Sequence, residues 1–288
     1  MPGSPRPTRS PTITSPTIRS SERCTFAVVG HNEAATLGEV LGQCQAAARA
    51  GDVVWFVDSA STDASAALAA EAGVEVVPAP LGKGRAVDTA IARHSEGWLL
   101  LVDGDVEESE RSIPAALRDA AARSQADMIV GQVQSDGKRR SVTPYLYEPL
   151  VRALFPEAPQ LDRPLSGFRA LRAGLRVDRL PGGYGVEAHL NVEVALTGGR
   201  IETLPLGAHR GPTRGYVHIG RAARDIADAL LDLAVGYGRI ADRRAWEAWT
   251  ARVLAAIDDQ PGEGADDAAY FRALRAVAGE PLPPLPRR

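Results

Sequence analysis

Residues 99–107 read LLLVDGDVE, and in this stretch an apolar run stops at two aspartates, Asp103 and Asp105, that stand one residue apart. A short, continuously apolar run is typical of a strand that is buried on both faces of a sheet. Two carboxylates at the end of such a strand can bind a divalent cation, act as a nucleophile and acid pair, or form a turn, because Asp-Gly-Asp suits a turn. The stretch alone leaves these three possibilities open.

The segments on either side of this stretch alternate between strand and helix patterns. We expect strands at 24–30, 52–58, 74–79, 98–105 and 127–133, and helices at 33–50, 63–72, 84–94 and 113–124. Continuous apolar strands that alternate with helices predict an α/β fold with a mostly parallel sheet flanked by helices. Since Asp103 and Asp105 follow the fourth strand, they do not match an aspartate-based phosphatase, in which the pair follows the first strand.

Polar side chains follow each of the first four predicted strands. They are His31, Asn32 and Glu33 after the first strand, Asp58 and Ser59 at the second, Lys83 after the third, and Asp103 and Asp105 at the fourth. A helix cap explains Ser61, Thr62 and Asp63 without any ligand. However, ligands of parallel sheets bind beyond the carboxyl ends of the strands, where all these ends meet. Acids and a lysine at this edge indicate a ligand site.

The composition is that of a soluble globular protein, with 288 residues, 44% hydrophobic and 24% charged. A formal net charge of −3 argues against a general nucleic-acid-binding protein, which carries a basic excess. Cys24 and Cys44 form neither a metal-ligand spacing nor a disulfide framework, which suits a reducing cytosol. No apolar run approaches the roughly 20 residues that a membrane span needs. We therefore expect a cytoplasmic protein without a membrane-inserted segment.

The two ends of the chain differ from its middle. Residues 1–22 are rich in Pro, Ser, Thr and Arg and lack the apolar region of a secretory signal, so we expect a disordered tail. Residues 216–280 are expected to form a helical C-terminal extension, with the helical pattern over 220–256, and 281–288 a flexible tail. An apolar stripe at helical spacing favours a core or dimer contact there over a place in the active site. Its members are Ile226, Leu230, Leu233 and Ala234.

Seven stretches carry a resemblance to a known family. VVGHNEAATLGEVL (28–41), VDSASTDAS (57–65), LGKGRAVDTAI (81–91) and LLLVDGDVE stand in the order and spacing of the GT-A, family 2-like nucleotide-sugar glycosyltransferases. PLSGFRALRA (164–173), GGYGVEAHLNVEVAL (182–196) and LGAHRG (206–211) look like the retaining glucosyl-3-phosphoglycerate synthase group. The resemblance implies a Rossmann-like GT-A catalytic domain over 23–215. Its nucleotide-sugar half is about 23–133 and its acceptor half about 134–215.

The resemblance also implies which residues carry the chemistry. It makes Asp105 a direct ligand of Mn²⁺ or Mg²⁺ and a member of the catalytic set, and it offers His209 as a further metal ligand. It places Glu187 against the donor sugar at the reaction centre, as a catalytic residue but not as a nucleophile, with His189 as an alternative. The residues it implies for the nucleotide sugar are Gly30, Asn32, Glu33, Asp58, Ser59, Lys83, Asp103, Gly104 and Gly167.

The same residue types also have plainer explanations. On the residues alone, His209 and Lys83 are also compatible with solvated loops. His189 is also compatible with a place in the core. Glu187 is compatible with an ordinary first-turn acid that complements the helix dipole.

The acceptor side departs from the pattern of that group. Ser141 stands where the phosphoglycerate-using members have an arginine, and Gly211 replaces an asparagine. A serine cannot restore the bidentate, charge-assisted bonds of an arginine to phosphate. Lys138, Arg139 and Arg140 lie just upstream, and they either compensate or form a solvated basic loop. We therefore expect a small-molecule acceptor other than 3-phosphoglycerate, such as a secondary-metabolism intermediate that attacks through O or S.

Three other functions stay open. The chain could be a glucosyl-3-phosphoglycerate synthase proper, or a non-catalytic nucleotide-sugar sensor, although a sensor need not keep the aspartates, the glutamate and the histidine. A nucleotidyltransferase fits less well, because it opens with a Gly-rich loop bearing Arg and Lys after the first strand, and VVGHNEAAT lacks that loop. The sequence does not distinguish a UDP-sugar from a GDP-sugar. Related proteins lead us to expect a homodimer.

Overall fold

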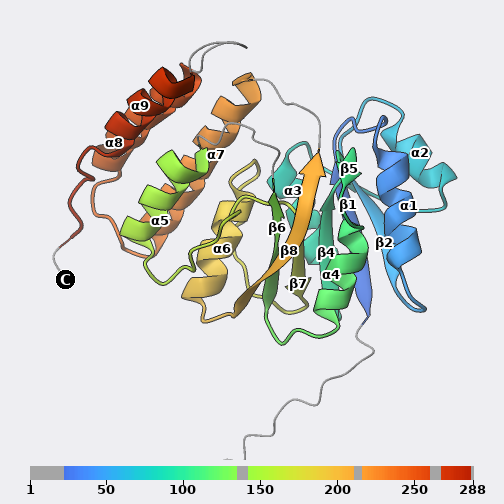
Figure 1. The fold of residues 1–288 in the computed structure, drawn as a ribbon. Coiled ribbons are helices and arrows are strands. Elements are labelled where there is room, and N and C mark those ends of the chain that lie inside the picture. Colours follow the sequence, from blue (N-terminus) through green and yellow to red (C-terminus); the bar gives the residue numbers. More distant parts are fainter. Residues whose placement is uncertain (1–22, 135–141, 211–215, 260–266, 287–288) are drawn as a thin grey trace, which may run out of the picture.

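The computed structural model describes residues 23–134, 142–210, 216–259 and 267–286. Across these residues the strands form a sheet in the order β3-β2-β1-β4-β7-β6-β8-β5, with helices on both faces (Figure 1). The strands are β1 (Cys24–Gly30), β2 (Val53–Ser59), β3 (Glu75–Ala79), β4 (Trp98–Asp103), β5 (Glu108–Ser109), β6 (Met128–Gln134), β7 (Arg169–Arg172) and β8 (Ile201–Arg210).

The helices are α1 (Leu37–Ala47), α2 (Ser65–Glu71), α3 (Lys83–Arg93), α4 (Ile113–Ala121), α5 (Glu148–Leu154), α6 (Val186–Leu196), α7 (Tyr216–Gly236), α8 (Arg243–Asp258) and α9 (Asp267–Ala278). A π-helical turn, η1 (Thr143–Tyr147), leads into α5. Together with the sheet order, these elements confirm the predicted α/β class with a mostly parallel sheet and a helical C-terminal part. No helix in the described ranges is long and apolar enough to cross a membrane.

The register of the parallel strands β3, β2, β1 and β4 brings their carboxyl ends level. Gly30 at the end of β1 pairs with Asp58 of β2, and Val29 pairs with Asp103 of β4. These strands form because their runs are apolar and can be covered on both faces, and all of β1 is buried. The polar residues that follow the strands therefore lie along one edge of the sheet.

The other half of the sheet is mixed. β7 runs antiparallel between β4 and β6, while β6 is parallel to β8. The strand predicted at 127–133 is β6, but a strand from later in the chain separates it from β4. The short β5 pairs antiparallel with β8 and places Ser109 opposite His209. This pairing brings the end of β8 next to the segment that follows Asp105.

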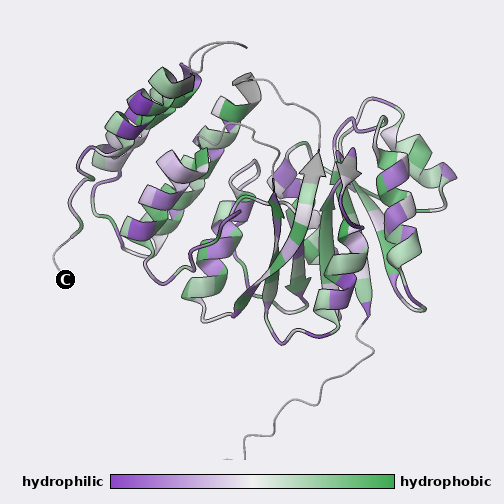
Figure 2. Cartoon of the chain, in the orientation of Figure 1, coloured by the Kyte–Doolittle hydropathy of each residue, from purple (hydrophilic) through white to green (hydrophobic). Residues whose placement is uncertain are grey.

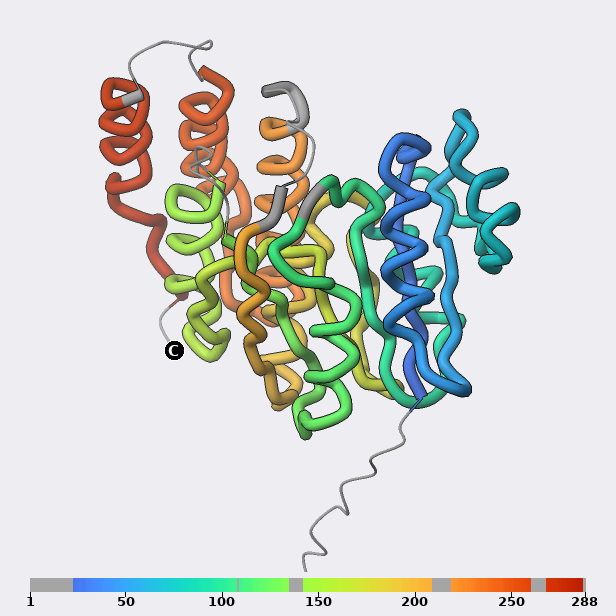
Figure 3. Tube along the Cα trace, turned by 45° about the vertical axis from the view of Figure 1, so that its right-hand side comes forward, coloured from blue at the N-terminus to red at the C-terminus, as the bar shows by residue number. Residues whose placement is uncertain are grey.

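Three hydrophobic clusters hold these layers together. One lies between the sheet and α1, α2 and α4, and a second between the sheet and α3 and α6. The third contains residues of η1 and of the helices α5, α6, α7, α8 and α9. Of these helices, α5, α7, α8 and α9 stand as a group beside the sheet in Figure 3. Figure 2 shows mostly hydrophobic strands, whereas the helices alternate hydrophobic and hydrophilic residues. The third cluster contains the predicted apolar stripe, and Leu282 from the expected tail packs against it.

Two helix predictions differ from the structure. The helix expected over 33–50 begins at Leu37, because Asn32 has a φ of +57° and a turn follows in which Thr36 and Leu37 both donate to the Glu33 carbonyl (3.1 and 2.9 Å). Asn32 and Glu33 therefore precede the helix. The helical stretch expected over 220–256 is broken between α7 and α8, where Gly238 adopts a φ of +64°.

Candidate active site

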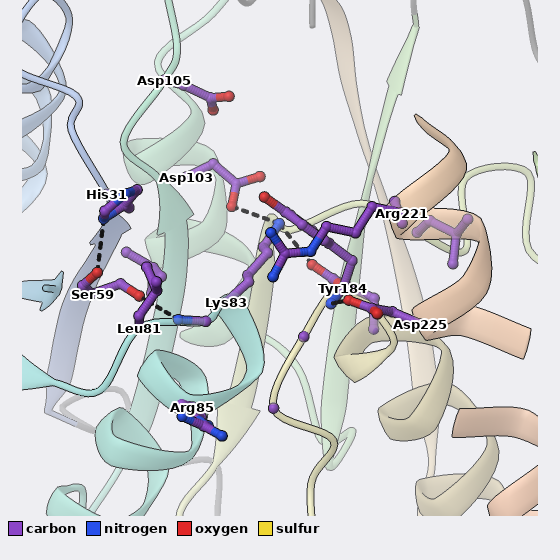
Figure 4. Close-up of a pocket in the computed structure, with 18 of the residues that line it drawn as sticks. His31, Ser59, Leu81, Lys83, Arg85, Asp103, Asp105, Tyr184, Arg221 and Asp225 are labelled. Carbon is purple, nitrogen blue, oxygen red and sulfur yellow. Dashed lines mark hydrogen bonds and ion pairs between the residues drawn. The ribbon is translucent and has the colours of Figure 1, made fainter. Parts of the chain in front are cut away.

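A pocket of about 840 Å³ opens at the carboxyl ends of the parallel strands (Figure 4). The loops after β1 to β4 line one side, and the segment before α6 and the start of α7 line the other. The predicted site residues that line it are Gly30, Glu33, Ser59, Lys83, Asp103, Gly104, Asp105 and Glu187. Asn32 and Asp58 are not among the lining residues, and Gly167 lines a small adjoining cavity. The structure thus brings groups from separate strand ends into one site.

Lys83 lies at the centre of this site. Its Nζ is 3.0 Å from Oδ1 of Asp103 and 2.7 Å from Oε1 of Glu187. The side chains of Lys83 and Asp103 are about one-fifth exposed, and that of Glu187 is 6% exposed. Burial alone lowers the pKa of Lys83, but the two carboxylates outweigh it and the pKa is raised. The lysine therefore stays protonated between the two acids.

Burial also acts on Asp103. It raises the pKa of this carboxyl above its usual range, and the neighbouring Asp105 and Glu187 add to the effect. The Lys83 ammonium opposes the shift. The carboxylate of Asp103 thus depends on a nearby positive charge to remain ionised.

The position of Lys83 is set by two glycine-rich loops that interlock. Gly82 has a φ of +134°, which favours glycine, and leads directly into α3. The backbone N–H of Gly84 donates to the Gly183 carbonyl at 3.1 Å, and that of Arg85 donates to the Gly182 carbonyl at 3.3 Å. A Cβ on Gly84 would overlap the carbonyl of Pro181. The loop that carries Lys83 is therefore held on the loop that leads to Glu187.

Gly167 is a further position beside the site, next to Asp103, where a side chain would not fit. A Cβ built on Gly167 would overlap the Asp103 carboxylate, so only glycine leaves room for this rotamer. The resemblance implied a contact of Gly167 with the nucleotide sugar. In the structure Gly167 lies against the Asp103 carboxylate, and its contact with the nucleotide sugar stays a prediction.

A buried arginine that sequence reasoning missed holds the loop around Gly167. Arg169 is fully buried and donates to the carbonyls of Pro164 (2.7 Å) and Ser166 (2.9 Å) and to Oδ1 of Asn191 (2.7 Å). Burial lowers its pKa, and nearby Glu187 works against that shift. The signal was present in the sequence, because Arg169 interrupts the otherwise apolar pair Phe168 and Ala170. A charge in such a place needs dedicated hydrogen-bond partners.

The loop after β1 is tied to the loop after β2. Nδ1 of His31 lies 2.8 Å from the Ser59 carbonyl. Oδ1 of Asn32 accepts from the backbone N–H of Thr62 at 2.7 Å, and Oδ1 of Asp58 accepts from that of Ser61 at 3.0 Å. Asn32 thus joins the two loops and Asp58 bonds within the loop that follows β2, and neither residue lines the pocket. Their predicted contact with the nucleotide receives no support from this geometry.

The two predicted histidines lie in different surroundings. His189 is buried on α6, where Nε2 lies 2.6 Å from Oε2 of Glu193 and 3.1 Å from the Asp178 carbonyl, and it does not line the pocket. His209 lies on β8 opposite Ser109. The His209 side chain lies outside the described part of the structure.

The residues present fit a divalent cation. The carboxylates of Asp103 and Asp105 line the same pocket, and β5 brings the backbone of His209 next to their segment. Among the side chains that the structure describes, no three His, Cys, Asp or Glu groups form a metal cluster. Carboxylate oxygens are nevertheless the ligands that Mg²⁺ and Mn²⁺ prefer.

The start of α7 also lines the pocket, with Ile219, Arg221, Ala222, Asp225 and Ile226. The expected apolar stripe of this helix did not indicate that its first turns also line the pocket. The apolar stripe correctly predicts that α7 packs in a core. It carries no information on which other element that helix meets.

The fold and the pocket are those expected of a GT-A sugar-transferring enzyme, and comparison with known proteins identifies the family. The sequence profile of glycosyl transferase family 2 matches residues 25–178, which is more than half of the chain. The chain belongs to glycosyl transferase family 2 and is a glycosyltransferase, as its motifs predicted. No curated protein sequence matches it.

Several solved structures of glucosyl-3-phosphoglycerate synthase from Mycobacterium tuberculosis share the fold. The complex with Mn²⁺, UDP-glucose and phosphoglyceric acid is 24% identical, with a TM-score of 0.66 over 75% of this chain and 81% of that one. The complex with Mn²⁺, UDP and phosphoglyceric acid is 23% identical, with a TM-score of 0.67 over 75% and 80%. The complex with Mg²⁺ and UDP is 24% identical, with a TM-score of 0.65 over 75% and 80%. These similarities confirm the predicted GT-A fold.

Proposed function

We propose that this protein is a metal-dependent, retaining glycosyltransferase that moves a sugar from a nucleotide-diphosphate donor to a small-molecule acceptor. The observation that carries the proposal is the cluster in which the Lys83 ammonium lies between the Asp103 and Glu187 carboxylates. Asp105 follows Asp103 at the rim of the same pocket. These groups can hold a charged donor on one side and a sugar on the other.

The donor in this proposal is a UDP-sugar. The related fold of the mycobacterial synthase, whose complexes contain UDP and UDP-glucose, supports this choice over a GDP-sugar. Glu33 and Ser59 line the pocket beside β1 and β2, where they can accept hydrogen bonds from a base N–H or a ribose hydroxyl.

Mn²⁺ or Mg²⁺ belongs to the proposal as the partner of the diphosphate. Asp105 would bind the ion, Asp103 would support it, and His209 would be a further ligand. Such an ion stabilises the negative charge that builds up on the leaving diphosphate. The complexes of the related synthase with Mn²⁺ and Mg²⁺ support this assignment.

Glu187 is the residue that we assign to the donor sugar. It lies in the first turn of α6, and one of its carboxylate oxygens accepts from the Lys83 ammonium. The other oxygen can accept from a sugar hydroxyl. Because the carboxylate is held by the ammonium, we assign it to positioning of the sugar and not to nucleophilic attack. In this proposal the acceptor attacks from the face of the leaving phosphate, so the anomeric configuration is retained.

The acceptor in this proposal is not 3-phosphoglycerate. The support is the replacement of an arginine by Ser141 and of an asparagine by Gly211 relative to the phosphoglycerate-using group. Ser141 and Gly211, like the basic residues Lys138, Arg139 and Arg140, lie outside the described residues. We assign as acceptor a different small molecule, which attacks the sugar through an oxygen or a sulfur atom.

We also propose that the protein acts as a cytoplasmic homodimer, without nucleic acid or membrane insertion. Both Cys24 and Cys44 are buried thiols, which suits a reducing compartment. Sedimentation of the purified protein tests the dimer.

Donor turnover tests the proposed activity. UDP-glucose, UDP-N-acetylglucosamine and GDP-mannose are incubated with Mn²⁺ and the protein, and release of nucleotide by slow hydrolysis is followed. We expect at least one UDP-sugar to turn over, with a loss of roughly a hundredfold or more in Glu187→Gln and Asp105→Asn. The exposed Glu75→Gln variant is the control. Binding of UDP without any turnover would favour the sensor over the enzyme.

A further inference from the structure

The roles assigned so far do not use every charged group of the pocket. Arg221 lines the pocket from the second turn of α7. Figure 4 shows its side chain extending from that helix into the pocket, toward Lys83 and Asp103. It comes from the helical C-terminal part of the chain and faces the strand ends of the N-terminal half.

The place of Arg221 is fixed by its helix. Asp225 follows one turn later on α7, and its Oδ2 accepts from the backbone N–H of Tyr184 at 2.8 Å. A Cβ on Gly183 would overlap the Asp225 carboxylate, and one on Gly185 would overlap the Asp225 carbonyl. The same loop is bonded to the start of α3, next to Lys83. The helix that carries Arg221 is therefore held in a set position relative to the central cluster.

The other charged side chains of the pocket indicate what Arg221 could bind. The acids that line it are Glu33, Asp103, Asp105, Glu187 and Asp225. Lys83 is engaged by two of these carboxylates. In Figure 4, Arg85 lies below the turn that carries Lys83, away from Asp105. Beside the divalent cation proposed for the diphosphate, a further positive charge favours the binding of an anionic substrate in a pocket with this acidic lining.

Arg221 differs from its neighbour Arg224 on the same helix. Arg224 forms an ion pair with Asp258 of α8. Within the described residues, Arg221 is exposed and makes neither an ion pair nor a hydrogen bond. A guanidinium group presents a rigid fork of N–H donors that matches phosphate and carboxylate oxygens. The two arginines thus provide a matched pair for experiment.

We propose that Arg221 is a substrate-binding residue that binds an oxyanion of a substrate, and that α7 is part of the active site. The oxyanion is a phosphate or carboxylate group, and it belongs either to the diphosphate of the donor or to the acceptor. The identity of these ligands rests on the proposed function. The role of Arg221 in binding an anion rests on the pocket itself.

Calorimetric titration separates the two sources. UDP with Mg²⁺ is titrated into wild type, Arg221→Gln, Arg221→Lys and Arg224→Gln. If the oxyanion is the donor diphosphate, the affinity for UDP falls by roughly tenfold to a hundredfold in Arg221→Gln. Arg221→Lys then recovers part of the loss, and Arg224→Gln stays within about twofold of wild type.

A second titration covers the acceptor. Inorganic phosphate is titrated into the same four proteins saturated with UDP and Mg²⁺. If the oxyanion belongs to the acceptor, wild type and Arg224→Gln bind phosphate and Arg221→Gln does not, while all four bind UDP equally. Unchanged UDP affinity together with unchanged or absent phosphate binding overturns the proposal.

The proposed function and the role of Arg221 fail in different ways. If wild type binds neither UDP nor GDP with metal, the proposed function fails. The phosphate titration is then made without nucleotide, and a difference between Arg221→Gln and wild type still decides whether Arg221 binds an oxyanion. Equal binding in that titration overturns the role of Arg221 as well.

Discussion

Lys83 neutralises two carboxylates that come from distant parts of the chain. Asp103 ends β4 and Glu187 lies in the first turn of α6, and both contact the same ammonium group. Bringing three charged groups out of water is costly, and their mutual attraction offsets the cost only while all three are present. Lys83 therefore affects both the stability of the site and the ionisation of its two carboxylates.

Replacing Lys83 tests this link. In Lys83→Met, Glu187 remains almost fully buried beside Asp103 without the ammonium, and we expect the free energy of unfolding to fall by about 3 kcal/mol. The double variant Lys83→Met/Glu187→Gln should recover part of the loss, because the two residues share one interaction. Urea denaturation followed by circular dichroism measures both. A stability of Lys83→Met equal to that of wild type would contradict this account.

Gly167 offers a second test at the scale of one residue. The added methyl group of Gly167→Ala would overlap the Asp103 carboxylate and turn it away from Lys83. We expect the affinity for UDP with metal to fall by about tenfold or more, because small displacements of site groups are expensive. Gly42→Ala is the control, since nothing lies within 4 Å of its Cβ. This exposed helical position should gain about 0.5–1 kcal/mol of stability and keep the affinity unchanged.

At the scale of elements, local patterns identified the strands and helices of the N-terminal half, because their apolar runs and periodicity leave little choice. β1 matches its predicted range, because a short run of apolar or small residues favours a strand that is buried on both faces of the sheet. β7 was not predicted, because Arg169 and Arg172 flank its apolar pair and their partners come from other segments. The periodicity of α7 identified its buried face. It could not identify the pocket that its first turns meet.

One buried ion pair joins elements far from the pocket. The Asp52 carboxylate accepts from Nε of Arg118 on α4 at 2.7 Å and from the backbone N–H of Cys24 at the start of β1 at 2.8 Å. We expect Asp52→Asn to lower the free energy of unfolding by about 3–5 kcal/mol without any change in UDP affinity. Glu75→Gln, which breaks the exposed pair with Arg93, should cost less than about 1 kcal/mol. Urea denaturation and calorimetry of the two variants check this contrast.

At the scale of the whole molecule, the pocket is assembled from both halves of the chain. The resemblance of the motifs located Lys83, Asp103, Asp105 and Glu187 in the site, because strand ends and a helix start have fixed places in this fold. The resemblance did not locate Arg221. The position of such a side chain depends on how α7 packs against the loop before α6, and that packing involves contacts between residues far apart in sequence.

The close packing between the sheet and α1 predicts that the thiols of Cys24 and Cys44 do not react in the folded protein. Cys24 and Cys44 are fully buried in the cluster under α1, and burial raises the pKa of the Cys44 thiol to about 12. At pH 8 we expect neither of the two thiols to react with a disulfide reagent in the folded protein, and both to react in urea. Absorbance of the released thiolate measures the reaction. Rapid labelling of the folded protein would show that this layer opens readily.

The most direct test of the central claim is calorimetric titration of UDP, with and without Mn²⁺, into wild type, Asp105→Asn and Glu107→Gln. Glu107 is exposed, follows Asp105 by two residues and does not line the pocket, so its variant is the matched control. We predict binding that needs Mn²⁺ in wild type and Glu107→Gln and that weakens by at least roughly tenfold in Asp105→Asn. Equal binding with and without metal, or equal binding by wild type and Asp105→Asn, would contradict the assignment of Asp105 to a metal that holds the donor diphosphate.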